Sequence, residues 1–398
     1  IRRPPRSTPS NSSAASDVYK RQHILSGLKI LKKFLKGVKL MAEKVAIIGA
    51  GNAGYAMAGD LALEGFDVNL YEMPNFAGNL KPLMHTRKIN LIGAIQGSVT
   101  LNLVTTNIKE ALEGVKYIMI VTQAHAHEII ARECAPYLED GQIITIFPDN
   151  AGSLIFKKVL CEEGVNKDIK IGGTYTLPYG CRKKDAGTVW FHYKLPGRNP
   201  FAALPAKDNQ EVADELNKIY PGMMWPRSNV LEIILQNPNI TVHPIGTLLN
   251  IGRIEFSKGE FWLYKEGLTK SAWKLVEAVD KEKMQILQEL GLPALPREQL
   301  RKEMRHLSRE EFKKDSAKGP TSTKHRYVTE DVPIGMVFMA SLGEMLGVET
   351  PTTKAIIEIF SKINETDYWK QGRTVEVCGI GNMSKEDLLK YVEEGKIK

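Results

Sequence analysis

Residues 44–72 read KVAIIGAGNAGYAMAGDLALEGFDVNLYE, in which two apolar runs flank a glycine-rich turn and an alanine-rich stretch. The apolar runs predict strands over 44–48 and 66–71. The alanine-rich stretch predicts a helix over 52–64 that ends at Gly65. The chain therefore contains a βαβ unit near its N-terminal end.

The turn GAGNAG at 49–54 lies where the first strand meets the helix, which is where such units bind the pyrophosphate of a dinucleotide. The first glycine permits the tight turn, the second lets the backbone approach the phosphates, and the third lets helix and strand pack closely. The alternative is a glycine-rich turn without a ligand. The residues expected to bind the cofactor are Gly49, Gly51, Asn52, Ala53 and Gly54.

Glu72 ends the second strand, 18 residues after Gly54. A carboxylate there can accept hydrogen bonds from the adenosine ribose hydroxyls and would repel a 2′-phosphate, which favours NAD over NADP. NADP can still be accepted if the loop after the strand is reshaped. The alternative is a solvated glutamate at a strand end.

Alternation of short apolar strands with helices continues through the first half of the chain, and PGMMWPRSN at 221–229 interrupts it. This pattern predicts an α/β fold with a Rossmann-type, doubly wound parallel sheet, followed by an all-α C-terminal substrate domain. We expect an N-terminal extension over 1–40, a dinucleotide-binding domain over 41–224 and a helical domain over 225–398. The further strands are expected over 117–122, 142–147, 169–174 and within 186–205, and the helices over 126–138, 152–163, 208–219, 230–236, 244–256, 269–290, 297–305, 333–347, 352–362 and 384–394.

The net charge of +8 over 398 residues comes from the N-terminal end. Residues 1–40 hold ten Lys or Arg and one Asp, and the other 358 residues hold 44 basic and 45 acidic side chains. Residues 1–22 resemble a non-native extension, 23–40 have helical spacing with lysines between leucines, and Met41 is the expected native start. We expect no nucleic-acid partner and no stable membrane insertion, although a native 23–40 helix would reopen membrane association. Four widely spaced cysteines favour a reducing, cytoplasmic setting and no metal cluster.

A dinucleotide domain followed by a helical one suggests a dehydrogenase, in which a proton must accompany the hydride. Histidine is the usual proton carrier near neutral pH, and the chain has eight. His243 lies after the break between the two halves and before a predicted helix. Either it faces the site between the halves or it is a packed or helix-capping histidine.

Three blocks make the chain from about Met41 onward resemble the opine dehydrogenases of the octopine/nopaline type: the glycine motif, residues 237–255 and HRYVTEDVPIGMV at 325–337. The C-terminal stretch LGVETPTTKAIIEIFSKINETDYWKQGRT adds to the resemblance. It implies an NAD-dependent enzyme, with NADP as the alternative cofactor, that reductively condenses a pyruvate-like 2-oxo acid with the amino group of an amino acid. Hydride from NADH would reduce the imine formed between them.

The same resemblance makes His243 the acid/base and Asp331 its partner. A carboxylate on one imidazole nitrogen fixes the tautomer and raises the basicity of the other. Asp331 can also be read as a helix N-cap before Pro333. By resemblance Arg326 reaches the cofactor pyrophosphate, and the competing interpretation is a surface arginine in a basic stretch.

Gln123 and Asn150 follow two predicted parallel strands, at the sheet edge where ligands bind, and are candidates for the 2-oxo acid carboxylate or the nicotinamide amide. Two other functions stay open. One is a 2-hydroxyacid dehydrogenase or ketopantoate-reductase-like enzyme, and the other is a non-catalytic NAD(H)-binding sensor. The substrates expected are small molecules, and the sequence leaves the oligomeric state open.

Overall fold

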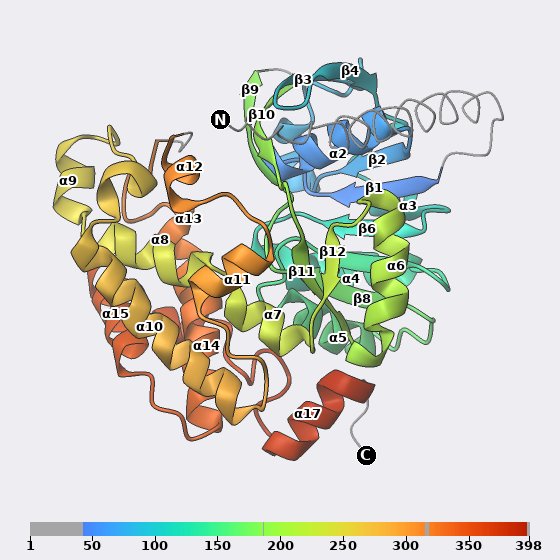
Figure 1. Cartoon of the computed structure of the whole chain (residues 1–398). Helices are drawn as coiled ribbons and strands as arrows, with labels where there is room; N and C mark the ends of the chain where they lie inside the picture. The colour runs from blue at the N-terminus through green and yellow to red at the C-terminus, as the bar shows by residue number, and fades with distance from the viewer. Residues whose placement is uncertain (1–42, 186, 315–317, 396–398) are drawn as a thin grey trace, which may run out of the picture. The chain divides into compact units, whose positions relative to one another are not determined.

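The computed structural model describes residues 43–185, 187–314 and 318–395. Its larger sheet has eight strands in the order β12-β11-β8-β7-β6-β1-β2-β5, and the run from β8 to β5 is parallel throughout (Figure 1). β11 joins β8 antiparallel, and β12 pairs with β11 in parallel. The strands are β1 Lys44–Ile48, β2 Asp67–Tyr71, β5 Leu103–Thr105, β6 Tyr117–Ile120, β7 Ile143–Ile146, β8 Lys170–Thr174, β11 Asn199–Leu204 and β12 Met224–Pro226.

Both faces of this sheet are covered, which confirms the doubly wound fold. Along β1, Val45 and Ile47 contribute to one apolar cluster, and Ala46 and Ile48 contribute to the other. This division follows from the twofold alternation of side chains along a strand. Helices α2 Asn52–Glu64 and α6 Asn209–Ile219 supply the first cluster, whereas α4 His127–Cys134 and α5 Gly152–Glu162 supply the second together with the short α3 Ile108–Leu112.

A second, four-stranded sheet is a feature that the sequence pattern did not predict. Its order is β4-β3-β10-β9, and it packs on the side of α2 that faces away from the larger sheet. β3 and β10 pair in parallel although about 95 residues separate them, and local periodicity cannot reveal such a pairing. The strands are β3 Lys88–Gly93, β4 Gly97–Thr100, β9 Tyr179–Asp185 and β10 Thr188–Lys194.

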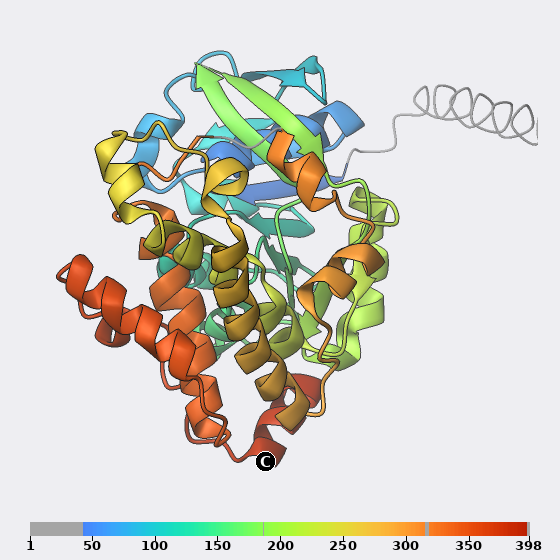
Figure 2. The same ribbon diagram turned by 60° about the vertical axis from the view of Figure 1, so that its left-hand side comes forward.

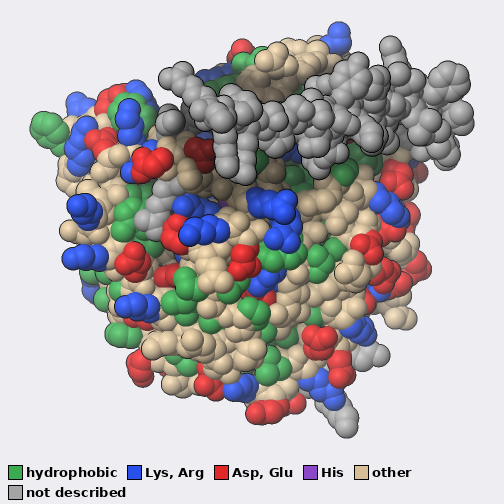
Figure 3. Space-filling view, viewed as in Figure 1, with side chains coloured by type: hydrophobic (Ala, Val, Ile, Leu, Met, Phe, Trp, Pro, Cys, Tyr) green, Lys and Arg blue, Asp and Glu red, His purple; other side chains and the backbone are tan. Residues whose placement is uncertain are grey.

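The rest of the chain is helical, as predicted. Figure 2 shows α10 beside α14 and α15, and these three helices are in contact. On the face shown in Figure 3, basic and acidic side chains are interspersed over this helical part. The elements are α7 Val230–Gln236, α8 Asn239–Leu248, α9 Ile251–Phe256, the π-helix η5 Leu263–Gly267, α10 Lys270–Glu289, α11 Arg297–Glu303, α12 Arg309–Lys314, α13 Arg326–Thr329, the π-helix η6 Asp331–Met336, α14 Val337–Met345, α15 Pro351–Ile363, α16 Tyr368–Gln371 and α17 Lys385–Glu394.

The helix expected over 244–256 is two helices, and the first begins five residues earlier than predicted. The Asn237 side chain accepts a hydrogen bond from the backbone N–H of Asn239, 2.9 Å away, and this begins α8. Pro244, the first residue of the predicted range, instead lies inside α8. His243 is therefore a mid-helix residue.

The last helix of the chain returns to the α/β part. α17 packs against β11 and against the 3₁₀ turn η4 Ala206–Asp208, which follows that strand. One apolar cluster runs from the α/β part into the helical part, and it includes residues of β6, α5, α10, α14 and α17. Within residues 43–395, a common hydrophobic core therefore connects the α/β half and the helical half.

Candidate active site

His243 and Asp331 form a buried pair. The Nδ1 atom of His243 lies 2.7 Å from Oδ2 of Asp331, and the two residues are 5% and 3% exposed. α8 carries the histidine, η6 carries the aspartate, and these elements pack against each other. Because a carboxylate is acceptor-only when ionised, Nδ1 carries the proton in this pair and Nε2 is the basic nitrogen.

Two tyrosines complete the surroundings of this imidazole. The Tyr264 hydroxyl lies 2.5 Å from Nε2 of His243, where it donates to the basic nitrogen. The ring of Tyr327 stacks on the imidazole, with ring centres 3.7 Å apart and planes inclined by 14°. The ring is thus held by a carboxylate, a hydroxyl and an aromatic face, and Nε2 points toward a polar group rather than into packed hydrocarbon.

Burial lowers the pKa of His243 below its usual 6.5. The Asp331 carboxylate raises this pKa, whereas the positive charges of Arg326 and Arg297 lower it further. Burial also raises the pKa of the Tyr264 hydroxyl well above its usual range. At neutral pH the site therefore holds a neutral imidazole and a neutral phenol.

The capping interpretation of Asp331 is wrong. Glu330, not Asp331, stands before the first residue of η6, and no side chain caps that helix. The carboxylate of Asp331 turns toward α8 instead, because the buried imidazole offers it a hydrogen-bond donor.

The glycine motif has the geometry that its sequence predicts. Gly49 has φ +108°, a conformation that side chains rarely adopt, and a Cβ on Gly54 would lie 1.7 Å from the Gly49 carbonyl oxygen. A Cβ on Gly51 would meet no atom within 4 Å. The first and third glycines are thus required by the fold, whereas the second borders open space.

Glu72 lies beside this motif and is buried. Its Oε2 accepts hydrogen bonds from the backbone N–H of Ala50 and from the Asn79 amide, each at 3.0 Å. Its Oε1 accepts from the N–H of Met73 at 3.1 Å. A dinucleotide that followed the motif from the turn to the end of β2 would thus meet Glu72.

Lys183 is a residue near the glycine motif that the sequence did not indicate. Its Nζ lies 3.1 Å from the carbonyl oxygen of Ala50, 3.4 Å from the Asn79 amide oxygen and 4.6 Å from the ring centre of Tyr55. Its backbone N–H donates to the side-chain oxygen of Asn52, 2.8 Å away. Burial lowers the pKa of Lys183 more than the Glu72 carboxylate raises it. β9 of the smaller sheet therefore brings a cation to the predicted phosphate site.

Arg326 takes part in a link between the two halves. Its Nε lies 3.0 Å from Oε2 of Glu330, and the other oxygen of Glu330 accepts from the N–H of Ala124, 3.0 Å away, after β6. The Arg326 side chain is 43% exposed, whereas Glu330 is buried. Arg326 is thus more than a solvated surface arginine, because it pairs with a carboxylate that reaches the α/β part.

The loops after β6 and β7 differ in their contacts. The Asn150 side-chain oxygen accepts from the Asn237 amide at 2.5 Å, which joins this loop to the start of α8. Gln123 is exposed, and its side chain forms no hydrogen bond with His243. Asn150 is therefore close to the element that carries His243, whereas Gln123 has an exposed side chain just before the 3₁₀ turn Ala124–Ala126.

Arg373 is a second residue that the sequence analysis missed. Its guanidinium donates to the carbonyl oxygens of Asn150 and Ala124, each 2.6 Å away, and is 3.4 Å from Nδ1 of His127. Its backbone N–H donates to the carbonyl oxygen of Pro333 in η6. One buried arginine thus ties both loops to the segment that carries Asp331. Its position within the C-terminal block QGRT was a signal that could have found it.

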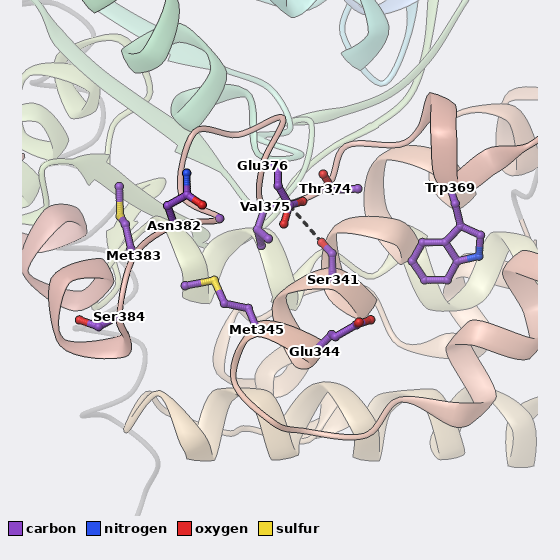
Figure 4. A pocket seen from close by; sticks show the side chains of 11 residues that line it. Ser341, Glu344, Met345, Trp369, Thr374, Val375, Glu376, Asn382, Met383 and Ser384 are labelled. Atoms are coloured by element: carbon purple, nitrogen blue, oxygen red, sulfur yellow. Dashed lines mark hydrogen bonds between the residues drawn. The ribbon is translucent and has the colours of Figure 1, made fainter.

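A separate hollow of about 550 Å³ lies beside α14 and α16, and none of the predicted site residues lines it (Figure 4). Its lining includes Ser341, Met345, Trp369, Val375 and Met383. Across the described ranges no group of three or more His, Cys, Asp or Glu residues is placed to hold a metal ion. No helix within those ranges is long and apolar enough to cross a membrane.

The doubly wound sheet, the glycine turn and the histidine–aspartate pair define a two-domain, NAD(P)-dependent dehydrogenase. The first half matches the family described as NAD-dependent glycerol-3-phosphate dehydrogenase N-terminus over residues 44–148. The second half matches NAD/NADP octopine/nopaline dehydrogenase, alpha-helical domain, over residues 226–364. The chain belongs to the opine dehydrogenase family, and it is an oxidoreductase that acts on CH–NH donors.

Relatives along most of the chain agree with this assignment. An opine dehydrogenase from Arthrobacter sp. (strain 1C) is 32% identical over 371 residues, which cover 88% of this chain and 99% of that protein. A vitopine synthase from Allorhizobium ampelinum is 24% identical over 85% of this chain and 96% of its own. A solved structure of octopine dehydrogenase with NADH and pyruvate shares the fold, with a TM-score of 0.69 at 16% identity over 89% of this chain and 98% of that one.

Proposed function

We propose that this enzyme condenses a 2-oxo acid of the pyruvate type with the amino group of an amino acid and reduces the product with NADH. The two substrates lose water to form a C=N bond. A hydride then adds to the carbon and a proton to the nitrogen. The sum consumes one NADH and one proton and releases NAD⁺ and water, together with a secondary amine that carries both carboxylates.

The observation that carries this proposal is the His243–Asp331 pair with Nε2 directed at a hydroxyl. In reduction, the neutral imidazole of His243 first takes up the proton that the reaction consumes. Nε2 then gives this proton to the substrate nitrogen, and Asp331 stabilises the transient charge on the ring. In oxidation, neutral His243 takes that proton. In this structure the Tyr264 hydroxyl is the hydrogen-bond partner of Nε2. The substrate nitrogen replaces that hydroxyl as the partner of Nε2 when the substrate binds.

The residues near the glycine motif fit a dinucleotide. Bound NADH supplies the hydride. The open side of Gly51 admits the pyrophosphate, the N–H groups at the start of α2 and the Lys183 ammonium face its charge, and Glu72 accepts from the adenosine ribose hydroxyls. Asn52 and Ala53 form the first turn of α2. From the helical half, the exposed guanidinium of Arg326 supplies a second cation for the pyrophosphate.

Asn150 is the stronger of the two candidates for contact with substrate, because it joins the start of α8. Gln123 remains a candidate for the substrate or the nicotinamide amide, with an exposed side chain. The identity of the amino acid depends on side chains of the helical half. Tyr264 contacts His243, and the Trp273 ring lies 5.6 Å from the guanidinium carbon of Arg297.

The test is a matrix of 2-oxo acids and amino acids, assayed with NADH and with NADPH. We expect cofactor oxidation only when both an oxo acid and an amine are present, and faster with NADH. Strong turnover with the oxo acid alone would instead show a 2-hydroxyacid dehydrogenase. Tight NADH binding without turnover of any pair would show a nucleotide sensor.

A further inference from the structure

Arg297 is a cation of the helical half, and it is attached to the helix that carries His243. It is the first residue of α11, and its Nη1 lies 3.2 Å from the carbonyl oxygen of Pro238 and 3.4 Å from Oγ1 of Thr241. Those two residues stand at the start of α8, five and two positions before His243. The guanidinium is therefore fixed relative to the catalytic candidate by two hydrogen bonds from a single nitrogen.

Arg297 forms no ion pair with a described residue, although the carboxylates of Asp280 and Glu298 act on its charge from farther away. Its Nε and Nη2 have no hydrogen-bond acceptor among the described residues, and no carboxylate lies within ion-pair distance. Asp280, the neighbouring acid, accepts only the backbone N–H of Arg297 and pairs through its other oxygen with Lys283. Partly buried charges are normally paired, so an unpaired guanidinium at such a position indicates an anionic ligand.

The surroundings of Arg297 are those of the candidate active site. Its guanidinium carbon lies 5.6 Å from the centre of the Trp273 ring, and its charge acts on Tyr264, Tyr175 and His243. Tyr175 follows β8 of the α/β part, whereas the other three belong to the helical part. The cation thus lies where residues from both halves come together.

We propose that Arg297 binds the α-carboxylate of a substrate through its two unpartnered nitrogens, Nε and Nη2, and so positions the reacting carbon or nitrogen against His243. This inference rests on the proposed function, in which both substrates carry an α-carboxylate. The planar guanidinium fork matches the two oxygens of a carboxylate, which a lysine ammonium does not.

The test compares Arg297→Met and Arg297→Lys with Arg301→Met in the full chain. Arg301 lies one turn further along α11 and already pairs with Glu298 at 2.6 Å, so it is the matched control. We expect Arg297→Met to raise the KM of one carboxylate substrate about 10–100-fold, as for a lost hydrogen bond to a charged group, and to lower kcat much less. Arg297→Lys should recover part of the loss, and Arg301→Met should leave both KM values unchanged.

The two possible sources of the carboxylate are separated by analogues. If Arg297 binds the 2-oxo acid, its KM rises, and the corresponding 2-oxo amide is insensitive to the substitution. If it binds the amino acid, that KM rises, and the decarboxylated amine is insensitive. Unchanged KM values for both substrates, or an equal rise in Arg301→Met, would overturn the proposal.

A binding measurement distinguishes failure of the proposed function from failure of the Arg297 proposal. If wild-type protein turns over no substrate pair, oxalate binding to the enzyme–NADH complex, followed by NADH fluorescence, tests Arg297 directly. Loss of oxalate binding in Arg297→Met with unchanged NADH affinity supports the carboxylate site, and unchanged oxalate binding refutes it. Circular dichroism and the unfolding midpoint check that each variant folds, and Arg297→Lys replaces Arg297→Met if the latter does not.

Discussion

Nδ1 of His243 and Oδ2 of Asp331 lie 2.7 Å apart although 88 residues separate them in the sequence. The contact joins the middle of α8 to the first residue of η6. It leaves Nε2 as the one nitrogen of the ring that can exchange a proton with a substrate. This relationship is the basis of the first two predictions.

Replacing His243 with Asn should remove the proton donor and keep the fold. We expect kcat to fall about 10²–10⁴-fold, the usual contribution of a general acid or base. NADH affinity, measured by fluorescence titration, should stay within about twofold, because His243 contacts no residue of the glycine motif. His85→Asn, at an exposed histidine, is the control. A variant that kept wild-type kcat would show that another group supplies the proton.

Replacing Asp331 with Asn should move the pH profile. Because the Asp331 carboxylate raises the pKa of His243, its loss lowers that pKa further below 6.5. Oxidation of the opine needs the neutral imidazole, so its rate falls as the pH drops through this pKa. The acidic limb of kcat/KM for oxidation should therefore lie at lower pH in Asp331→Asn, with a lower plateau. If the acidic limb of Asp331→Asn stays at the wild-type pH, the His243–Asp331 pair does not set the pKa that controls oxidation.

Replacing Lys183 with Gln should weaken cofactor binding. In the proposed cofactor site the ammonium beside the Ala50 carbonyl is expected to meet a phosphate. Loss of such a charge-assisted hydrogen bond at a half-exposed position should raise the Kd of NADH about 5–20-fold. Fluorescence titration of the resting enzyme measures this without turnover.

Lys184→Gln is the control for this experiment. Lys184 is the next residue along β9, and its ammonium lies over the Trp190 ring instead of the glycine motif. An equal rise in the Kd of NADH in both variants would show that the effect comes from the overall positive charge of β9 and not from the position of Lys183. A larger loss for NADPH than for NADH would place Lys183 near the 2′-position of the adenosine ribose.

Replacing Arg373 with Met should destabilise the protein. The guanidinium satisfies the buried carbonyl groups of Ala124 and Asn150, and its removal leaves both without these donors. We expect the free energy of unfolding to fall by about 2–4 kcal/mol, measured by urea denaturation. Arg132→Met, at an exposed arginine that pairs with three glutamates, should change the unfolding midpoint little. Similar losses in the two variants would contradict the role given to Arg373.

Local patterns predicted the elements that depend on neighbours in the sequence. The strand over 44–48 and the helix over 52–64 lie where expected, and α10 spans Lys270–Glu289 against a predicted 269–290. The start of α8 was missed: the predicted range began at Pro244, whereas the hydrogen bond from the Asn239 N–H to the Asn237 side chain lies at a start five residues earlier. The role of Asp331 as partner of His243 came from family resemblance, since a carboxylate before a proline fits a helix cap equally well.

Local patterns specify the alternation of strands and helices, the glycine turn and the helical second half, because side-chain periodicity and backbone freedom act over a few residues. Long-range packing sets the pairing of β3 with β10, the approach of Lys183 to the glycine motif, and the positions of Arg297 and Arg373. Those features join segments that are far apart in the chain. The sequence pattern around a charged residue does not show whether its side chain is exposed to solvent or buried beside a distant carbonyl group.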